Sequence, residues 1–529
     1  MNNPLLEVRD LTVEFANTDA PAVDQVSFTL SAGETIGIVG ESGSGKSVSC
    51  LSILGLLPHG SRATVTGTVR LDGENIFDLP KKAIRRLRGE QISMIFQDPM
   101  SSLNPYHRIG RQIIEPAVVR GVSENEAKQA ALQLLIDTGV AHDPADAEIR
   151  YRQYPHEFSG GMRQRVMISI ALITNPRILI ADEPTTALDA TTQRQVLSII
   201  KNLQADRNVA LLFISHDLNV VRQVADRVLV MKSGKVVEQG RCEEVLESPR
   251  HPYSKQLIDS VPRETKKESS RMEFEIENDL IKLTQVGVDF RVGKRLHTAV
   301  DSVDLAIRYG EVLGLVGESG SGKSTIAMAI NRLCRLSRGE IHLDGESIQK
   351  IPDERLKQFR KHVQLVFQDP YSSLNPRMNA YETIAEPLRV HRLVHDEREE
   401  LSRVVELAEQ VEIDPRDLKK YPHAFSGGQR QRIAIARAIA VNPRLLVADE
   451  CVSALDVTIQ KQVMDLLLQL TRSLDMAMLF ISHDLAVIRY MSDRVAVMKD
   501  GAIVELNDTR SLFKAPQNEH TKELIQSMI

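Results

Sequence analysis

The chain has 529 residues, of which 42% are apolar and 26% are charged, and its formal net charge is −5. This length predicts more than one domain, each large enough to bury its own core. The small negative charge gives no basic footprint for nucleic acid, and the four cysteines (Cys50, Cys242, Cys334 and Cys451) form no C-x-x-C pair that would indicate a disulfide framework or a metal site.

Short apolar segments alternate with longer helical patterns along the chain. T-I-G-I-V at Thr35–Val39 is followed by R-I-L-I-A before Asp182 and by A-L-L-F-I-S before His216, and three closely similar segments recur in the second half. Such near-continuous apolar runs predict strands buried on both faces of a parallel α/β sheet, with function at the carboxyl ends of the strands. A polar segment with helical spacing in each half, such as E-N-E-A-K-Q-A-A-L-Q-L-L, predicts a helical subdomain.

The motifs of the first half return in the second half in the same order, which indicates a duplicated domain. The sequence G-E-S-G-S-G-K-S stands at Gly40–Ser47 and again at Gly317–Ser324. Residues 262–278 are charged and poor in branched apolar residues, which is typical of an exposed linker. We therefore expect a first domain at residues 1–261, a linker at 262–278 and a second domain at 279–529. No apolar run reaches the roughly 18–20 residues that span a bilayer, and we expect no signal peptide.

The two glycine-rich sequences predict loops that bind nucleoside triphosphate. Their glycines let backbone N–H groups point at phosphate oxygens, and the helix that follows presents its positive end to the same anion. The lysines would reach the β- and γ-phosphates, and the last serine of each loop would hold Mg²⁺. A purely structural turn could explain one such sequence, but not two in the same strand–loop–helix context. The predicted contacts of the two loops are Gly40, Ser42, Gly43, Ser44, Gly45, Lys46, Ser47 and Val48, and Gly317, Ser319, Gly320, Ser321, Gly322, Lys323, Ser324 and Thr325.

A pair of acidic residues follows an apolar strand segment in each half. Asp182 and Asp449 suit a contact with Mg²⁺, and the adjacent Glu183 and Glu450 suit a general base that orients the attacking water. The alternative is an acidic residue that stabilises a helix N-terminus. That alternative explains a single copy equally well, but it does not explain two copies in register, each downstream of a phosphate loop.

F-S-G-G-M-R-Q-R at Phe158–Arg165 and F-S-G-G-Q-R-Q-R at Phe425–Arg432 resemble the signature sequence of ABC-type ATPases. This resemblance implies that the signature of one half caps the γ-phosphate of an ATP held by the other half. Site one would then pair the first loop with Ser426, Gly427, Gly428 and Gln429, and site two would pair the second loop with Ser159, Gly160, Gly161 and Met162. It also implies an α/β fold of two tandem nucleotide-binding domains, each with a RecA-like parallel-sheet core, an antiparallel β subdomain and a helical subdomain.

Further residues take roles only through this resemblance. Gln97 and Gln368 match the glutamine of the family's Q-loop, which would also contact Mg²⁺, and His216 and His483 match its switch histidine beside the γ-phosphate. A-L-D at 187–189 and at 454–456 matches the loop that couples the two sites. Phe15 and Phe290 are candidates for the aromatic ring that stacks on adenine, although each could simply be part of the core.

The segments F-Q-D-P-M-S-S-L-N-P and F-Q-D-P-Y-S-S-L-N-P, together with S-P-R-H-P-Y-S-K-Q-L-I-D-S-V-P, are similar to the ATPases of oligopeptide, dipeptide and nickel importers. Fusion of two ATPases is similar to the glutathione importer and the microcin-type peptide importer. The resemblance implies ATP and Mg²⁺ as cofactors, two transmembrane permease partners, a separate substrate-binding protein, no nucleic acid, and a peripheral location on the cytoplasmic face of the inner membrane. We expect two different permeases because the segments after Gln97 and Gln368 differ.

A tandem ABC ATPase that acts on ribosomes or DNA is the alternative function. It predicts a long charged arm or a coiled coil between the halves and often a basic patch, whereas residues 262–278 are a short linker and the net charge is negative. The two signatures differ at Met162 and Gln429. Methionine cannot donate the hydrogen bond of an amide, so we expect site two to hydrolyse ATP modestly more slowly than site one.

Overall fold

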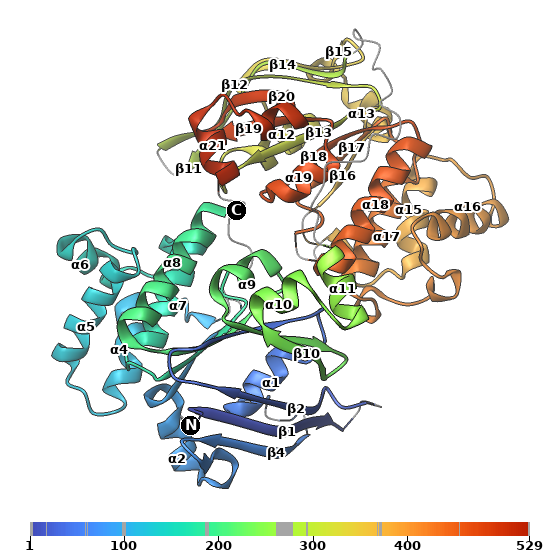
Figure 1. Cartoon of the computed structure of the whole chain (residues 1–529). Coiled ribbons are helices and arrows are strands. Elements are labelled where there is room, and N and C mark those ends of the chain that lie inside the picture. The colour runs from blue at the N-terminus through green and yellow to red at the C-terminus, as the bar shows by residue number, and fades with distance from the viewer. Residues whose placement is uncertain are drawn as a thin grey trace. The chain divides into compact units, whose positions relative to one another are not determined.

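The structure of the chain is a computed structural model that describes residues 4–16, 18, 20–58, 60, 62–97, 102–185, 190–260, 279–292, 295–367, 369, 373–453 and 455–526. Its residues divide into two compact units, the first from Met1–Leu188 and Thr192–Val261, and the second from Asp189–Thr191 and Pro262–Ile529. The linker predicted at 262–278 lies outside the described residues. Figure 1 shows the first unit in blue to green and the second in yellow to red.

Each unit contains one antiparallel sheet and one larger, mostly parallel sheet. In the first unit the four-stranded sheet has the order β2-β1-β4-β5 and the six-stranded sheet the order β10-β9-β3-β8-β7-β6. All neighbours in the larger sheet are parallel except β9 and β10. The strands are β1 Leu6–Phe15, β2 Val23–Leu30, β3 Thr35–Val39, β4 Ala63–Leu71, β5 Glu74–Asn75, β6 Ile92–Ile95, β7 Ile178–Asp182, β8 Ala210–Ile214, β9 Arg227–Lys232 and β10 Lys235–Arg241.

The second unit repeats this topology, with the orders β12-β11-β14-β15 and β16-β17-β18-β13-β19-β20. Its strands are β11 Asp279–Val292, β12 Arg295–Arg308, β13 Val312–Gly317, β14 Arg338–Leu343, β15 Glu346–Ser347, β16 Val363–Val366, β17 Leu445–Asp449, β18 Ala477–Ile481, β19 Arg494–Lys499 and β20 Ala502–Asp508. The predicted α/β class, with a parallel core, an antiparallel β subdomain and a helical subdomain, is confirmed.

Helices cover the larger sheets and form the helical subdomains. In the first unit they are α1 Lys46–Ile53, α2 Lys81–Glu90, α4 Ile109–Val118, α5 Glu124–Asp137, α6 Pro144–Arg152, α7 Gly160–Leu172, α8 Ala190–Arg207, α9 Leu218–Val224, α10 Cys242–Glu247 and α11 Pro252–Asp259. In the second they are α12 Lys323–Ile330, α13 Asp353–His362, α15 Ala380–Val390, α16 Glu397–Gln410, α17 Gly427–Ile439, α18 Val457–Ser473, α19 Leu485–Met491, α20 Thr509–Lys514 and α21 Glu519–Gln526. Where the first unit has α6, the second has only the short 3-10 turn Pro415–Asp417.

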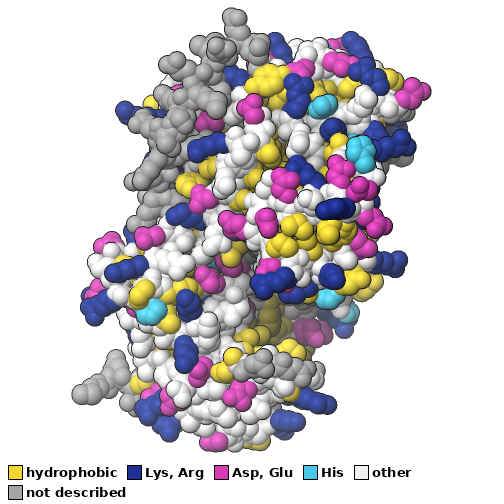
Figure 2. All heavy atoms as spheres, turned by 90° about the vertical axis from the view of Figure 1, so that its right-hand side faces the viewer, with side chains coloured by type: hydrophobic (Ala, Val, Ile, Leu, Met, Phe, Trp, Pro, Cys, Tyr) yellow, Lys and Arg dark blue, Asp and Glu magenta, His cyan; other side chains and the backbone are white. Residues whose placement is uncertain are grey.

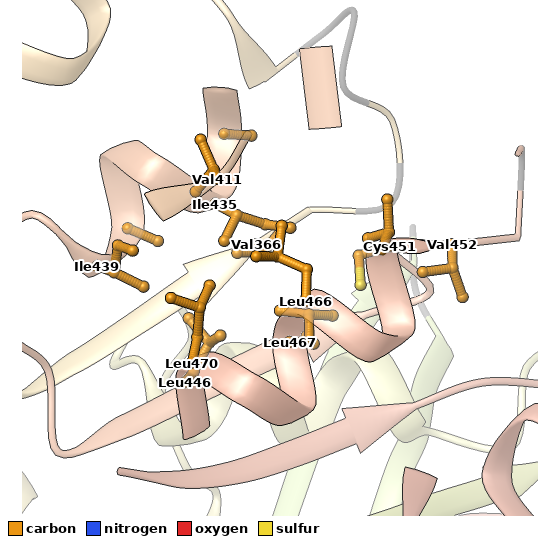
Figure 3. Packing of buried hydrophobic residues seen from close by; sticks show 14 of the residues in the cluster. Val366, Val411, Ile435, Ile439, Leu446, Cys451, Val452, Leu466, Leu467 and Leu470 are labelled. Atoms are coloured by element: carbon orange, nitrogen blue, oxygen red, sulfur yellow. The ribbon is translucent and has the colours of Figure 1, made fainter. Parts of the chain in front are cut away.

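The central strands are buried on both faces, as their apolar sequences predict. In β8, Leu212 belongs to the cluster shared with the antiparallel sheet, whereas Leu211 and Phe213 belong to the cluster under α7 and α8. Figure 3 shows the matching cluster of the second unit, where side chains from α17, α18 and the sheet meet. This rigid centre fixes the carboxyl ends of the strands, where the predicted site residues lie.

On the face shown in Figure 2, lysine and arginine side chains are interspersed with aspartate and glutamate. Within the described residues, no helix is long and apolar enough to cross a membrane.

Candidate functional site

The first glycine-rich loop connects the end of β3 to the start of α1. Gly45 caps α1 with a φ of 98°, in the left-handed region that favours glycine. At Gly40 a Cβ would lie 2.2 Å from the carbonyl oxygen of Met231, so a side chain cannot fit there. The loop is therefore tightly packed against β9, which leaves its backbone and the N-terminus of α1 to face a ligand.

The second loop has nearly the same geometry. Gly322 caps α12 with a φ of 103°, and a Cβ on Gly317 would lie 2.2 Å from the carbonyl oxygen of Met498. The remaining predicted contacts occupy the loops and first helical turns: Ser42, Gly43, Ser44 and Val48 in the first unit, and Ser319, Gly320, Ser321 and Thr325 in the second.

The loop lysines lie within the loops they belong to. Lys46 Nζ donates to the carbonyl oxygens of Gly40 and Glu41, both at 2.8 Å. Lys323 Nζ makes the same two contacts, with Gly317 and Glu318, at 2.8 Å. Lys46 and Lys323 are only 6% and 5% exposed, so each loop holds a buried positive charge suited to a phosphate.

A serine and an aspartate meet in each unit at the position predicted for Mg²⁺. The Ser47 hydroxyl donates to Asp182 Oδ1 at 2.9 Å, and Ser324 donates to Asp449 Oδ1 at 3.2 Å. Burial raises the pKa of Asp182 to about 6, although the bond from Ser47 opposes the rise. Burial likewise raises the pKa of Asp449. A cation at this place would favour both carboxylates, so the hard oxygen donors and their electrostatics fit Mg²⁺.

Glu183 lies beside two other predicted residues in the first unit. Gln97 Nε2 donates to Glu183 Oε2 at 2.9 Å, and His216 Nδ1 lies 3.4 Å from the same oxygen. Its backbone has a φ of 48°, uncommon for a residue with a side chain. The structure therefore brings together a glutamate, a glutamine and a histidine that are far apart in the sequence.

In the second unit Glu450 and His483 form the matching pair, with His483 Nδ1 3.4 Å from Glu450 Oε2. Burial alone would lower the pKa of His483, but its hydrogen bond to Glu450 and the nearby carboxylates raise it. Burial alone would raise the pKa of Glu450, but the bond and charge of His483 lower it. Gln368, predicted to join this group, lies outside the described residues.

The signature serines cap the helices that follow them. Ser159 Oγ accepts the backbone N–H of Met162 at 3.3 Å, and Ser426 Oγ accepts that of Gln429 at 3.3 Å. Only the second signature completes the capping box, because Gln429 Oε1 accepts the N–H of Ser426 at 3.1 Å.

The signature glycines divide into an open one and a tightly packed one. A Cβ on Gly160 would meet nothing within 4 Å, and one on Gly427 would have only ordinary contact with Leu455. A Cβ on Gly161 would lie 2.4 Å from the Thr192 side chain, and one on Gly428 2.3 Å from Ile459. Each signature therefore presents an open backbone at its first glycine. The coupling segments 187–189 and Ala454 lie outside the described residues.

The two candidate adenine-stacking residues occupy equivalent strands in different surroundings. Phe15 ends β1, pairs with Ala63 and packs partly against the core. Phe290 in β11 pairs with His297 and is 38% exposed. The exposed ring of Phe290 is available to stack on adenine, whereas the ring of Phe15 also packs against the core.

Sequence reasoning did not place Tyr253 at the site. Its hydroxyl oxygen accepts the backbone N–H of Glu41 in the first phosphate loop at 3.1 Å. The H-P-Y pattern around it was visible in the sequence, but nothing in that pattern indicates a contact across 212 positions.

Family models show to which protein family the chain belongs. The model described as "ABC transporter" matches residues 23–186 and 300–453, once in each unit. The chain belongs to the ABC transporter family. This ABC protein is accordingly an ATPase with two ATP-binding cassettes, and residues 237–287 match the model described as "Oligopeptide/dipeptide transporter, C-terminal region".

Named relatives of this ABC protein match it over nearly their whole length. The "Peptidoglycan transport ATP-binding protein YejF" of Agrobacterium fabrum is 46% identical, over 99% of this chain and 96% of the relative. The "Glutathione import ATP-binding protein GsiA" of Salmonella typhimurium is 42% identical, over 99% and 89%. An uncharacterised ABC transporter ATP-binding protein of Escherichia coli, also called YejF, is 42% identical, over 99% of both chains.

Proposed function

We propose that this ABC protein is the energy-coupling subunit of a bacterial importer for peptides or peptide-like solutes of the oligopeptide, dipeptide or glutathione type. The observation that carries this proposal is the match of residues 237–287 to the C-terminal region of oligopeptide and dipeptide transporters, downstream of a full cassette. The names of the relatives, which concern peptidoglycan transport and glutathione import, point to the same class of cargo.

The proposed hydrolysis uses two composite sites. In each, the phosphate loop holds the ATP phosphates, and the signature of the other unit closes on the γ-phosphate with its serine, its open glycine and the N-terminus of its helix. Glu183 and Glu450 take a proton from the attacking water, and His216 and His483 contact the γ-phosphate. The support lies in the matched geometry of the two units: 2.8 Å lysine contacts, serine–aspartate pairs and 3.4 Å glutamate–histidine pairs.

Ser47, Asp182 and Gln97 would hold Mg²⁺ in site one, and Ser324, Asp449 and Gln368 in site two. The ion would neutralise charge that develops on the phosphates. Among the residues that the structure describes, no three His, Cys, Asp or Glu side chains gather into a metal site of their own.

We further propose two different permeases as partners, a separate substrate-binding protein, and a peripheral position on the cytoplasmic face of the inner membrane. The segments after Gln97 and Gln368 would receive cytoplasmic helices of the permeases. Phe96 and Phe367, which come directly before these glutamines, are 39% and 44% exposed. Both rings are thus partly open to contact by a permease chain.

Crosslinking tests the partners. Single cysteines introduced at Ser102 and at Ser373 in the assembled transporter should capture two distinct permease chains. Capture of the same chain by both positions would contradict two different permeases. If the protein instead sedimented with ribosomes and not with membranes, the alternative of a tandem ABC ATPase on ribosomes would replace the importer.

A further inference from the structure

The helix α11, which follows the first cassette, contacts the first phosphate loop directly. The Tyr253 hydroxyl oxygen accepts the backbone N–H of Glu41 at 3.1 Å, and the residue is only 3% exposed. Lys232 Nζ lies 4.5 Å from the centroid of the tyrosine ring. Burial and the cation–π contact with Lys232 therefore hold the ring in place, and the ring carries the hydroxyl group to Glu41.

The segment that carries Tyr253 is itself anchored. Glu238 in β10 accepts the backbone N–H groups of Arg250 and His251, at 2.8 and 3.1 Å. His251 Nδ1 then accepts the N–H of Tyr253 at 3.2 Å and caps α11. Because these three backbone N–H groups have fixed acceptors, Tyr253 contacts the loop from a defined direction.

Tyr253 bonds to the Gly40–Glu41 peptide group, and the same peptide group accepts a hydrogen bond from Lys46. The N–H of Glu41 and the carbonyl of Gly40 belong to one planar peptide unit. Tyr253 binds the N–H end of this unit, and Lys46 Nζ donates to the carbonyl end at 2.8 Å. A peptide that is bonded at both ends cannot rotate freely, so the tyrosine helps to fix the position of the lysine.

The second unit keeps the anchoring frame but not the hydroxyl group. Glu505 accepts the N–H groups of Gln517 and Asn518, at 2.9 and 3.0 Å, and Asn518 Oδ1 accepts that of His520 at 2.9 Å. His520 stands where the first unit has Tyr253 and is 6% exposed. Within the described part of the chain, its Nε2 has no hydrogen-bond partner.

We propose that Tyr253 is a positioning residue for the first ATP site. Its hydroxyl group orients the Gly40–Glu41 peptide and thereby Lys46, which pre-organises the loop for the nucleotide phosphates. The second unit has His520, which carries no hydroxyl group, at the corresponding position. The inference rests on the proposed role of the loops as phosphate sites.

ADP with Mg²⁺ is the probe that isolates this effect, because its phosphates need only the phosphate loop of one unit. In the full chain carrying Lys323→Ala, where only the first loop is intact, Tyr253→Phe should raise the Kd for ADP about 2–10-fold, the effect of one hydrogen bond. Tyr253→His, which installs the residue of the second unit, should weaken binding in the same direction. The matched control is Tyr253→Phe in the Lys46→Ala chain, where the Kd of the second loop should stay the same.

An unchanged Kd in the Lys323→Ala, Tyr253→Phe chain would overturn the proposal. Equal weakening in the Lys46→Ala chain would also overturn it, because the effect would then be global. The role of the loops is checked separately: a chain with both Lys46→Ala and Lys323→Ala should lose ADP binding. If that chain bound ADP normally, the phosphate-site assignment would fail, whatever Tyr253 does.

Discussion

At the scale of single residues, the proposed bases are held by an unusual backbone. Glu183 and Glu450 have φ values of 48° and 47°, a region that side chains rarely adopt. Their N–H groups donate to the carbonyl oxygens of Ile214 and Ile481, at 3.0 and 2.9 Å. The neighbouring strand thus maintains a conformation that directs each carboxylate toward its histidine, and strain of this kind is typical of functional sites.

Replacing both glutamates with glutamine tests their role as bases. Glu183→Gln with Glu450→Gln should abolish turnover while ATP binding is kept, because the amide has the same shape but cannot accept the proton. Loss of a general base lowers rates by a factor of about 10²–10⁴. Phosphate release and ATP binding measured on the same sample check this, and near-normal hydrolysis would remove the glutamates from the role.

Asp182 gives a pH-dependent prediction for protein freed of nucleotide and metal. Its pKa is raised by burial from 3.8 to about 6, so its ionised form is disfavoured in the folded state. This destabilisation of the folded state is absent below about pH 4. It grows between about pH 4 and 6 and reaches its full size above about pH 6. Asp182→Asn keeps the acceptor for Ser47 and removes the charge, and it should stabilise the first unit above pH 6 by at most about 3 kcal/mol.

Thermal unfolding of Asp182→Asn and the parent chain, at pH 4 and at pH 8 in EDTA, measures this difference. The variant should unfold several degrees higher at pH 8 and at nearly the same temperature at pH 4. An equal gain at both pH values would show that the charge is not the cause.

At the scale of elements, the two signature helices differ in their caps. Gln429 closes a capping box with Ser426. Met162 has no side-chain acceptor for the N–H of Ser159, so the first signature has only one of the two hydrogen bonds of a capping box. Met162→Gln should complete it and stabilise the start of α7 by about 0.5–1 kcal/mol. In the proposed arrangement the signature of the first unit would serve site two, so turnover should rise by up to roughly 2–10-fold if that site limits the cycle. ATP turnover of Met162→Gln, with the reverse change Gln429→Met as its control, measures the effect, and equal rates in both variants and the parent would contradict it.

The elements also show what could be predicted from the sequence. The burial of β8 on both faces follows from its unbroken apolar run, and the two phosphate loops follow from their glycines, which the structure requires at Gly40 and Gly317. The contact of Tyr253 with Glu41 could not be predicted, because it depends on how α11 packs after 212 intervening positions. The hydrogen bond between Gln97 and Glu183 could not be predicted either, because nothing in the sequence around one residue indicates the other as its partner.

At the scale of the whole molecule, two cassettes of the same topology would share their parts in the proposed sites. Each unit holds a complete phosphate loop, a serine–aspartate pair and a glutamate–histidine pair. Each also carries a signature whose first glycine is open. The proposed head-to-tail arrangement predicts that both sites are active, with site two modestly slower, and that Lys46→Ala or Lys323→Ala alone cripples transport.

The most direct test counts the ATP molecules trapped per chain in the Glu183→Gln, Glu450→Gln background. Lys46→Ala with Ser426→Arg places both lesions in site one, so one ATP should still be trapped in site two. Lys46→Ala with Ser159→Arg places one lesion in site one and the other in site two, so no ATP should be trapped. The reverse result, with one ATP trapped in the second variant and none in the first, would show that each loop works with the signature of its own unit and would contradict the composite sites.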